Sequence, residues 1–309
     1  MSKPFKTYRQ QLSILRNRGM EIKDGGKVIK ILKRENYYSI INGYKDIFID
    51  NNSTIEKFKM GTTFEDIYCI FEFDRNLRNI FLKNILKIES LVNTKISYYF
   101  SERNQKEFSY LNINNFHPSK LEENTGLIAN ISNVIKDKSK SNKSNQISHH
   151  LKNHQDLPLW VLIKQFTFGI TAFFYSSLTD DIKDKISSEI SSEYSHEYKN
   201  MKINLSKEEL ENIIHFLNFL RNKCAHNERF FNTNKKKTAI VYPHSSEIFK
   251  GRLFDAVLLL KLFLFKKDFN IFREELKIEI DKINKELNTS IFNKVLIEMG
   301  FPKNWEERI

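Results

Sequence analysis

The residues best suited to chemistry lie in the stretch FLRNKCAHNERFF, which begins at Phe219 and contains Arg221 and His226. A histidine titrates near neutral pH, so it can take a proton from a ribose 2′-hydroxyl or give one to a leaving 5′-oxygen. An arginine can hold the scissile phosphate through two parallel hydrogen bonds and stabilise the charge that develops during the reaction. The pair therefore suits cleavage of RNA without a metal ion. The alternative interpretation is structural, namely a salt-bridged arginine and a histidine at a helix end.

The helix that must position these residues is expected to begin at Ser206, which forms an S-x-x-E capping box with Glu209. Its apolar residues recur at helical spacing and predict one buried face, and Arg221 falls within that face. Burying a lone charge is costly, so Arg221 needs a carboxylate partner or a polar cleft at the helix end. We expect Glu89 to act either as that ion-pair partner or as a group that tunes the site. The buried face comprises Leu210, Ile213, Ile214, Leu217, Leu220 and Cys224.

A second patterned face lies roughly opposite the first on the same helix. It contains His215, Phe219, Asn222 and His226, at spacings of four, three and four residues. A face of this kind suits contact with a partner subunit, a ligand or another core helix. On an ideal helix, Arg221 and His226 point about 140° apart. A compact catalytic pair therefore requires the helix to turn near its end or a second subunit to supply the missing half, and we predict a homodimer.

The composition fits a helical, globular protein. Of 309 residues, 40% are hydrophobic, whereas only 9 are glycine and 5 are proline. β-Sandwiches and Rossmann-type folds usually use more glycine in turns and phosphate loops. The net charge of +12 and the pI near 9.4 favour a polyanionic partner, either nucleic acid or an anionic membrane surface. A proteome whose proteins are basic in general would give the same net charge without any such partner.

No segment predicts export or insertion into a membrane. The N-terminal stretch MSKPFKTYRQQ lacks the apolar run of a signal peptide. The most apolar segment, Leu253 to Phe265, is too short to span a bilayer and contains Lys261, so we expect a buried core helix there. The two cysteines, Cys69 and Cys224, predict no disulfide framework. We expect a cytoplasmic protein without membrane contact.

The helix signals predict an all-α bundle in two parts. Residues 1–60 form a small N-terminal helical extension, and residues 61–309 form the main helical domain. Residues 136–156 are polar and basic and lack periodicity, so we expect a mobile loop there. Within the extension, the β-branched and aromatic stretch NYYSIINGYKDIFI predicts a strand or hairpin.

Capping boxes predict where two of the helices begin. Thr62 with Glu65 should start a long helix, and Ser119 with Glu122 should start the next one.

Basic side chains outside the motif are candidates for contact with RNA. Arg75 and Arg78 lie beside Asp74 near the start of the long helix, where they form either a set of surface ion pairs or an RNA contact. The polar loop is either a second RNA contact or a solvated insertion. Its candidate residues are Lys138, Lys140 and Lys143.

Two other constellations are less suited to chemistry. His149, His150 and His154 could contribute to a zinc site, but no cysteine or acidic cluster completes it, so we predict no metal and no other cofactor. Cys224 and His226 are two residues apart on a helix and point to different sides, which excludes a Cys–His nucleophile.

The stretch LRNKCAHNERFFN resembles the R-x4-6-H signature of HEPN ribonucleases. Further blocks of the chain resemble, in order, those of the Abi-like family of the AbiD/AbiF type. They are KPFKTYRQQLSILRNRGM, NYYSIINGY, FEFDRNLRNIFLKNILKIESLVNTKISYYFSE, LPLWVLIKQFTFG and MGFPKNW. One departure is Asn93, which stands where the family pattern leads us to expect an arginine.

The resemblance implies an α-helical HEPN domain and a role in abortive infection against phage. It also implies metal-independent cleavage of RNA at two motifs that meet across a dimer interface, and association with a small noncoding RNA. Carried over by the motif, Arg221 and His226 are the catalytic pair and Asn222 is the polar neighbour within the motif. The alternative function is a scaffold that binds a noncoding RNA and does not cut it.

Overall fold

The computed structural model describes residues 4–140, 146–154, 156–199, 201–235, 240 and 248–309. The prediction of an all-α protein is confirmed, because these residues form helices α1 to α12, short 3₁₀ segments and one π-helical turn. No β-strand occurs among them, and β-type pairing is limited to two isolated bridges, Glu21 with Thr63 and Ile49 with Phe58.

Helix α3 (Phe64–Arg103) is the axis of the molecule and is about 60 Å long, since each of its 40 residues adds about 1.5 Å. It begins at Thr63, which forms a capping box with Asp66, one residue later than the Thr62 box that the sequence predicted. The reason is that the carbonyl oxygen of Thr62 accepts a hydrogen bond from the backbone of Glu21. The fully buried apolar residues of α3 recur at helical spacing: Ile67, Ile70, Leu77, Phe81, Ile85, Ile88, Val92, Ile96 and Phe100.

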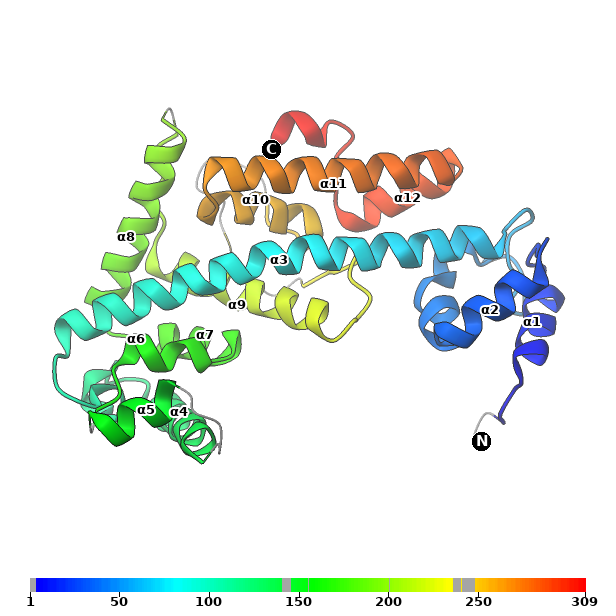
Figure 1. Cartoon of the computed structure of the whole chain (residues 1–309). Coiled ribbons are helices and arrows are strands. Elements are labelled where there is room, and N and C mark those ends of the chain that lie inside the picture. The colour runs from blue at the N-terminus through cyan, green and yellow to red at the C-terminus, as the bar shows by residue number, and fades with distance from the viewer. Residues whose placement is uncertain (1–3, 141–145, 155, 200, 236–239, 241–247) are drawn as a thin grey trace.

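The N-terminal unit packs at one end of α3 (Figure 1). It consists of α1 (Tyr8–Asn17), α2 (Gly25–Arg34), a π-helical turn (Tyr38–Asn42) and a 3₁₀ segment (Lys45–Phe48). The strand or hairpin predicted in this region was therefore wrong. Its β-branched and aromatic residues reflect burial instead, because the side chains of the stretch that enter the core are Ile40, Ile41, Tyr44, Ile47 and Phe48.

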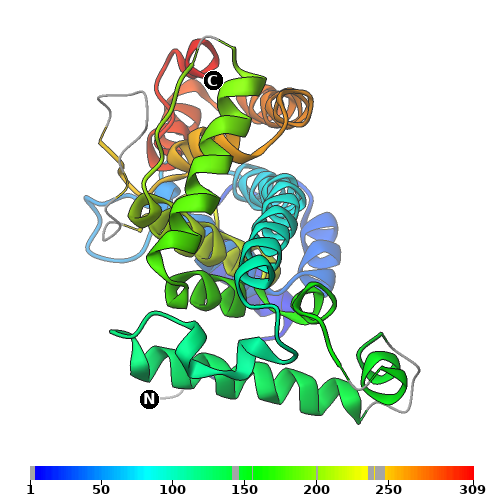
Figure 2. The same ribbon diagram turned by 90° about the vertical axis from the view of Figure 1, so that its left-hand side faces the viewer.

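A second group of helices gathers around the other end of α3. Helix α4 runs across the direction of α3 along one edge of the molecule, as Figures 1 and 2 together show. The group comprises α4 (Leu121–Ser139), α5 (Gln146–Asn153), α6 (Leu159–Leu162), α7 (Phe168–Ser177) and α8 (Asp180–Glu197).

Two sequence predictions for this group need correction. The expected mobile loop at 136–156 is in part helical, because α4 continues to Ser139 and α5 occupies Gln146–Asn153; residues 141–145 and 155 lie outside the described residues. Helix α4 also begins after Lys120 and not at a Ser119 capping box. The Ser119 hydroxyl instead lies 2.8 Å from the Nδ1 atom of His117, so it is not available to cap the helix.

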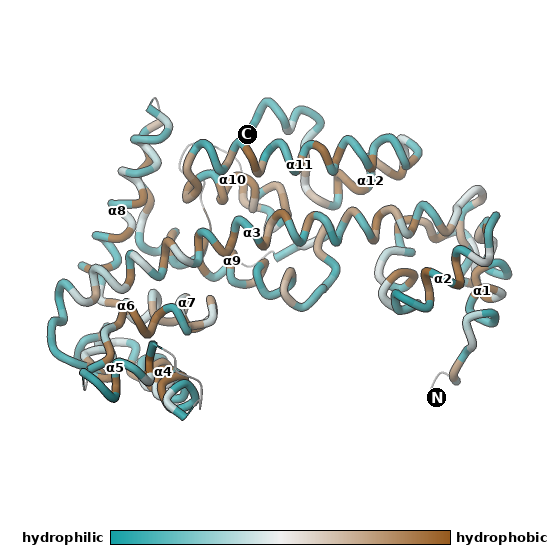
Figure 3. The backbone as a smooth tube through the Cα atoms, in the orientation of Figure 1, coloured by the Kyte–Doolittle hydropathy of each residue, from teal (hydrophilic) through white to brown (hydrophobic). Residues whose placement is uncertain are grey.

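Three further helices cover the side of α3 that faces the top of Figure 1. They are α10 (Leu253–Phe263), α11 (Lys266–Glu286) and α12 (Thr289–Met299), and α11 packs along α3. The prediction of a buried core helix at α10 is confirmed, since eight of its residues are buried. Hydrophobic residues concentrate along α3 and α10 in the middle of the molecule (Figure 3). In the described part of the chain, no helix has the length and apolar character needed to cross a membrane.

Candidate functional site

Helix α9 (Lys207–Ala225) carries the motif, and its position is fixed at its start and along its apolar face. The predicted capping box is present: Glu209 N–H donates to the Ser206 hydroxyl over 3.1 Å, and Ser206 N–H donates to the Glu209 carboxylate over 2.9 Å. The helix packs against α3, α7 and α8. All members of the predicted apolar face are buried, namely Leu210, Ile213, Ile214, Leu217, Leu220 and Cys224.

The candidate catalytic histidine lies at the point where α9 ends. His226 is the C-cap residue, and its backbone N–H donates to the carbonyl oxygen of Asn222 over 3.0 Å. Asn227 then adopts a left-handed conformation with φ of 55°, which turns the chain away from the helix axis. The side chains of Asn222 and His226 are both exposed. They are therefore available to a ligand or to a partner subunit.

Arg221 turns in the other direction, toward α3. Its Nε atom lies 3.7 Å from the Oε2 atom of Glu89, and the two side chains are 27% and 11% exposed. Of the two roles expected for Glu89, the structure shows the ion pair with Arg221. The distance is too long for a hydrogen bond, and neither atom has a hydrogen-bond partner within the described residues. Burial raises the pKa of the Glu89 carboxyl, while Arg221 acts to lower it.

The stability of an Arg221→Ala protein is expected to depend on pH. A carboxyl whose pKa is higher in the folded state stabilises the fold fully when protonated, and this contribution is lost as the pH rises through the folded-state pKa. Removing Arg221 strands the Glu89 carboxylate at high pH. We expect a loss of about 1–2 kcal/mol in unfolding free energy at pH 8 and a clearly smaller loss at pH 5. Denaturant unfolding at the two pH values measures this difference.

The control for this pH effect is Glu89→Gln in the Arg221→Ala background, which should remove most of the difference between the two pH values because no carboxyl remains to ionise. Equal losses at pH 5 and pH 8 would show that the Arg221 side chain contributes through packing and not through its charge.

A buried carboxylate organises the chain directly after the motif. Asp74 of α3 is 0% exposed and accepts hydrogen bonds from the Tyr44 hydroxyl over 2.6 Å and from Arg78 over 2.6 Å. It also accepts from the backbone N–H groups of Phe230, over 2.9 Å, and Phe231, over 2.5 Å. Burial raises the pKa of Asp74, and all four partners oppose that rise. Because every partner is a donor, the carboxylate accepts these bonds as an anion.

This Asp74 cluster, which we define as Tyr44, Asp74, Arg78 and the amides of Phe230 and Phe231, clamps the segment after His226 onto α3. The clamp has a second contact, since Arg78 also donates to the carbonyl oxygen of Glu228 over 3.1 Å. The N-terminal unit takes part through Tyr44. The segment that leaves the motif is thus held from two sides.

The two arginines that the sequence offered for RNA contact differ in their surroundings. Arg78 is only 4% exposed, so its ion pair with Asp74 is buried and not on the surface, and Arg78 is corrected from RNA contact to a structural role. Arg75 is 40% exposed, pairs with Glu35 over 2.6 Å and lies 4.7 Å from the centre of the Phe71 ring.

The Asp74 cluster was not predicted from the sequence. Its only local signal was an Asp and an Arg four residues apart on the apolar side of α3.

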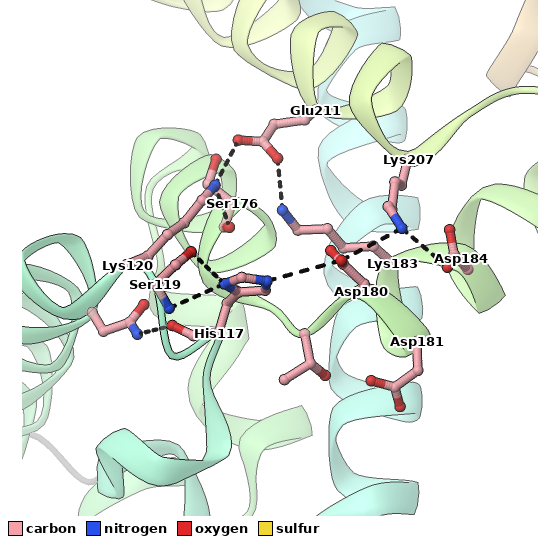
Figure 4. A network of polar contacts seen from close by, with 12 residues as sticks. His117, Ser119, Lys120, Ser176, Asp180, Asp181, Lys183, Asp184, Lys207 and Glu211 are labelled. Carbon is pink, nitrogen blue, oxygen red and sulfur yellow. Dashed lines mark hydrogen bonds and ion pairs between the residues drawn. The ribbon is translucent and has the colours of Figure 1, made fainter.

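A polar network fixes the other end of α9 (Figure 4). Glu211 pairs with Lys183 of α8 over 2.7 Å and with Lys120, which precedes α4, over 3.4 Å. Burial acts to raise the pKa of Glu211, but Lys183, the Ser176 hydroxyl and Lys120 together lower it below its usual value. Next to them, the Nε2 atom of His215 lies 2.9 Å from the Ser176 hydroxyl of α7. The network therefore joins α9 to the three neighbouring helical segments and sets the direction in which the helix carries the motif.

The basic residues of the predicted loop lie away from the motif in the sequence and on a different helix. Lys138 belongs to the last turn of α4, Lys140 is its C-cap residue, and both are exposed. Lys143 lies outside the described residues.

The structure also bears on the histidine and cysteine constellations of the sequence. The rings of His149, His150 and His154 lie within 6.1 Å of one another, yet the described part of the chain contains no group of side chains arranged to hold a metal ion. Cys224 is buried, and burial raises the pKa of its thiol to about 12, so it is a poor nucleophile. Asn93, which stands where the family pattern has an arginine, accepts a hydrogen bond on its Oδ1 atom from the Thr171 hydroxyl of α7.

Comparison with known proteins gives one family. A family model described as Abi-like protein matches residues 30–232, a range that contains helices α3 to α9 and the whole motif. No curated protein and no solved structure matches the chain.

Proposed function

The chain belongs to the Abi-like protein family, and we propose that it is a metal-independent HEPN endoribonuclease that acts in abortive infection against phage. The observation that carries this proposal is the position of His226. It is an exposed histidine at the end of α9, held between a fixed helix and a clamped segment, and it follows Arg221 at the spacing of the R-x4-6-H signature.

In the proposed reaction, His226 moves protons and Arg221 binds the phosphate. The imidazole takes the proton from a 2′-hydroxyl, which attacks the adjacent phosphorus and expels the 5′-oxygen of the next nucleotide. The second histidine of a dimer returns a proton to that leaving oxygen. Asn222 is exposed one helical turn before His226 and can donate to a phosphate oxygen. The products are a 2′,3′-cyclic phosphate and a free 5′-hydroxyl.

A homodimer is part of the proposal, because a single chain does not bring the pair together. Arg221 faces Glu89 on α3, whereas His226 faces solvent, and the two side chains share no hydrogen bond within the described residues. A second copy that docks on the exposed end of α9 would place two motifs around one phosphate. The proposed setting is the cytoplasm, with a small noncoding RNA as a companion.

One observation favours a second function, a scaffold that binds RNA without cutting it. The Nε atom of Arg221 is buried against Glu89, so the arginine is already partly engaged with a carboxylate. If RNA does not displace this contact, the site can hold a phosphate near His226 but lacks the full charge stabilisation that cleavage requires.

Incubation with labelled RNA in the presence of EDTA distinguishes the two functions. For the ribonuclease we expect fragments that end in 2′,3′-cyclic phosphate, because no step of the proposed reaction uses a divalent ion. For the scaffold, the RNA should be bound in a shift assay and recovered intact. Fragments that appear only when a divalent ion is restored would contradict the metal-independent mechanism.

A further inference from the structure

One side of α9 presents a row of aromatic and basic groups that leads to the motif. His215, Phe219 and Lys223 follow one another at four-residue spacing, so they lie on the same face, which ends near His226. From His215 to His226 this face is about 16 Å long, since eleven residues each add about 1.5 Å. Phe173 of the neighbouring helix α7 borders it, with its ring 6.0 Å from that of His215. We call these residues, together with Lys235, the α7–α9 face.

Two lysines converge on one ring in this face. The ammonium of Lys223 lies 5.7 Å from the centre of the Phe219 ring, and that of Lys235 lies 4.9 Å from the same centre. Lys235 is held in place because its backbone N–H donates to the carbonyl oxygen of Gly251 over 2.9 Å. It also opens the run KKK in the sequence.

Neither of these two ammonium groups forms an ion pair within the described residues, although the buried Lys95 and Lys183 and the half-buried Lys120 all pair with carboxylates. Burial lowers the pKa of both lysines. Glu228 is the charged group that acts most strongly to raise the pKa of Lys223, but the effect of burial is larger. Two partly desolvated cations that no described carboxylate neutralises form a ready binding site for an anion.

The same face offers a surface for stacking. Phe173 is 53% exposed, so its ring is accessible to a ligand. Next to it, His215 is half-buried, and burial lowers its pKa, so at neutral pH its ring adds no charge to the face. Exposed aromatic rings beside basic groups are the combination that binds single-stranded nucleic acid.

We propose that the α7–α9 face is a binding surface for single-stranded RNA, on which Lys223 and Lys235 contact successive phosphates and Phe173 stacks on a base. This surface would deliver the strand to His226 at its end. This inference rests on the proposed function for its ligand, but it assigns residues that the motif does not include.

The test measures binding and not cleavage. A fluorescent 2′-O-methyl RNA oligonucleotide cannot be cut by attack of a 2′-hydroxyl, so its affinity for the wild-type protein can be titrated over a range of salt concentrations. For the Lys223→Gln/Lys235→Gln protein, we expect the slope of log K against log salt to become shallower by about 1.4, because each lost phosphate contact on a single strand contributes about 0.7. For Phe173→Ala, we expect binding about five- to one-hundred-fold weaker with an unchanged slope.

Matched substitutions on α11 serve as controls. Lys266→Gln/Lys267→Gln removes two exposed lysines, and Phe265→Ala removes a ring that is 69% exposed, so neither should change affinity or slope beyond the common effect of net charge. Equal effects from both lysine pairs, or a variant of the α7–α9 face that binds with the wild-type slope and affinity, would overturn the inference. If those variants still bind and cleave RNA, the ribonuclease proposal survives; if the wild-type protein binds no RNA at all, both proposals fail.

Discussion

An His226→Ala protein is expected to lose RNA cleavage while it keeps its fold and its affinity for RNA. A positioned general acid or base contributes about 10²- to 10⁴-fold to the rate, so cleavage should fall to the detection limit of most assays. His226 is exposed, and its backbone N–H, not its ring, caps α9. Its removal should therefore change the unfolding free energy by no more than about 0.5 kcal/mol. Cleavage in EDTA, RNA binding and melting temperature should be measured on the same preparation.

The chain offers a matched control in His196, which is also an exposed histidine in the last turn of a helix, α8. His196→Ala should cleave RNA at the wild-type rate. An His226→Ala protein that melts normally and still cleaves like the wild type would end the assignment of the reaction to this motif. In cells, we expect the proposed anti-phage response to be lost with the His226 substitution and kept with the His196 substitution.

Asp74→Ala should destabilise the protein more than the loss of Arg221 or of His226 does. It leaves the Arg78 guanidinium, the Tyr44 hydroxyl and the amides of Phe230 and Phe231 without their acceptor in a buried site. Breaking a buried ion pair by removing one partner costs about 3–5 kcal/mol. For a protein of this size, each kcal/mol shifts the melting temperature by about 2 °C, so we expect a decrease of about 6–10 °C.

Milder variants separate the parts of the Asp74 cluster. Tyr44→Phe removes one hydrogen bond to a charged group and should cost about 1.5–3 kcal/mol. Tyr38→Phe is its control, because Tyr38 is 70% exposed and should be neutral. An Asp74→Ala protein that melts within about 2 °C of the wild type would mean that water replaces the carboxylate, and that the cluster does not hold the segment after the motif.

Sequence reasoning succeeded where the controlling interactions are local. The start of α9 follows from Ser206 and Glu209, which are three residues apart, and its buried face follows from helical spacing alone. The Arg221–Glu89 pair could be anticipated because a charge on an apolar face requires a partner, and Glu89 lies on the apolar side of the other long helix. The start of α3 was displaced by one residue because Thr62 and Thr63 are both suitable caps, and a distant contact with Glu21 decides between them.

The features that the sequence did not predict depend on contacts between segments that are far apart in the chain. Tyr44 and Phe230 meet at Asp74 only after the N-terminal unit and the segment following α9 have both packed on α3. Nothing near Asp74 in the sequence distinguishes a buried acceptor of four bonds from a surface carboxylate. The sequence predicted only part of the α7–α9 face: His215 and Phe219 belong to the second patterned face of α9, whereas Phe173 and Lys235 join it from outside α9, where helical spacing gives no signal.

The Asp74 cluster joins residues that are far apart in the sequence. This separation determines when the segment after the motif can be fixed in place during protein synthesis. The bonds from Asp74 to Phe230 join residues 156 positions apart, and contacts of such separation form late because a long loop must close first. A nascent chain on the ribosome therefore cannot fix the segment after His226 until Phe231 has emerged from the exit tunnel. For the ribonuclease proposed above, this order would keep unfinished chains inactive. Chains that end before Phe230 contain α3 and its carboxylate but lack the bonds that fix the segment after the motif.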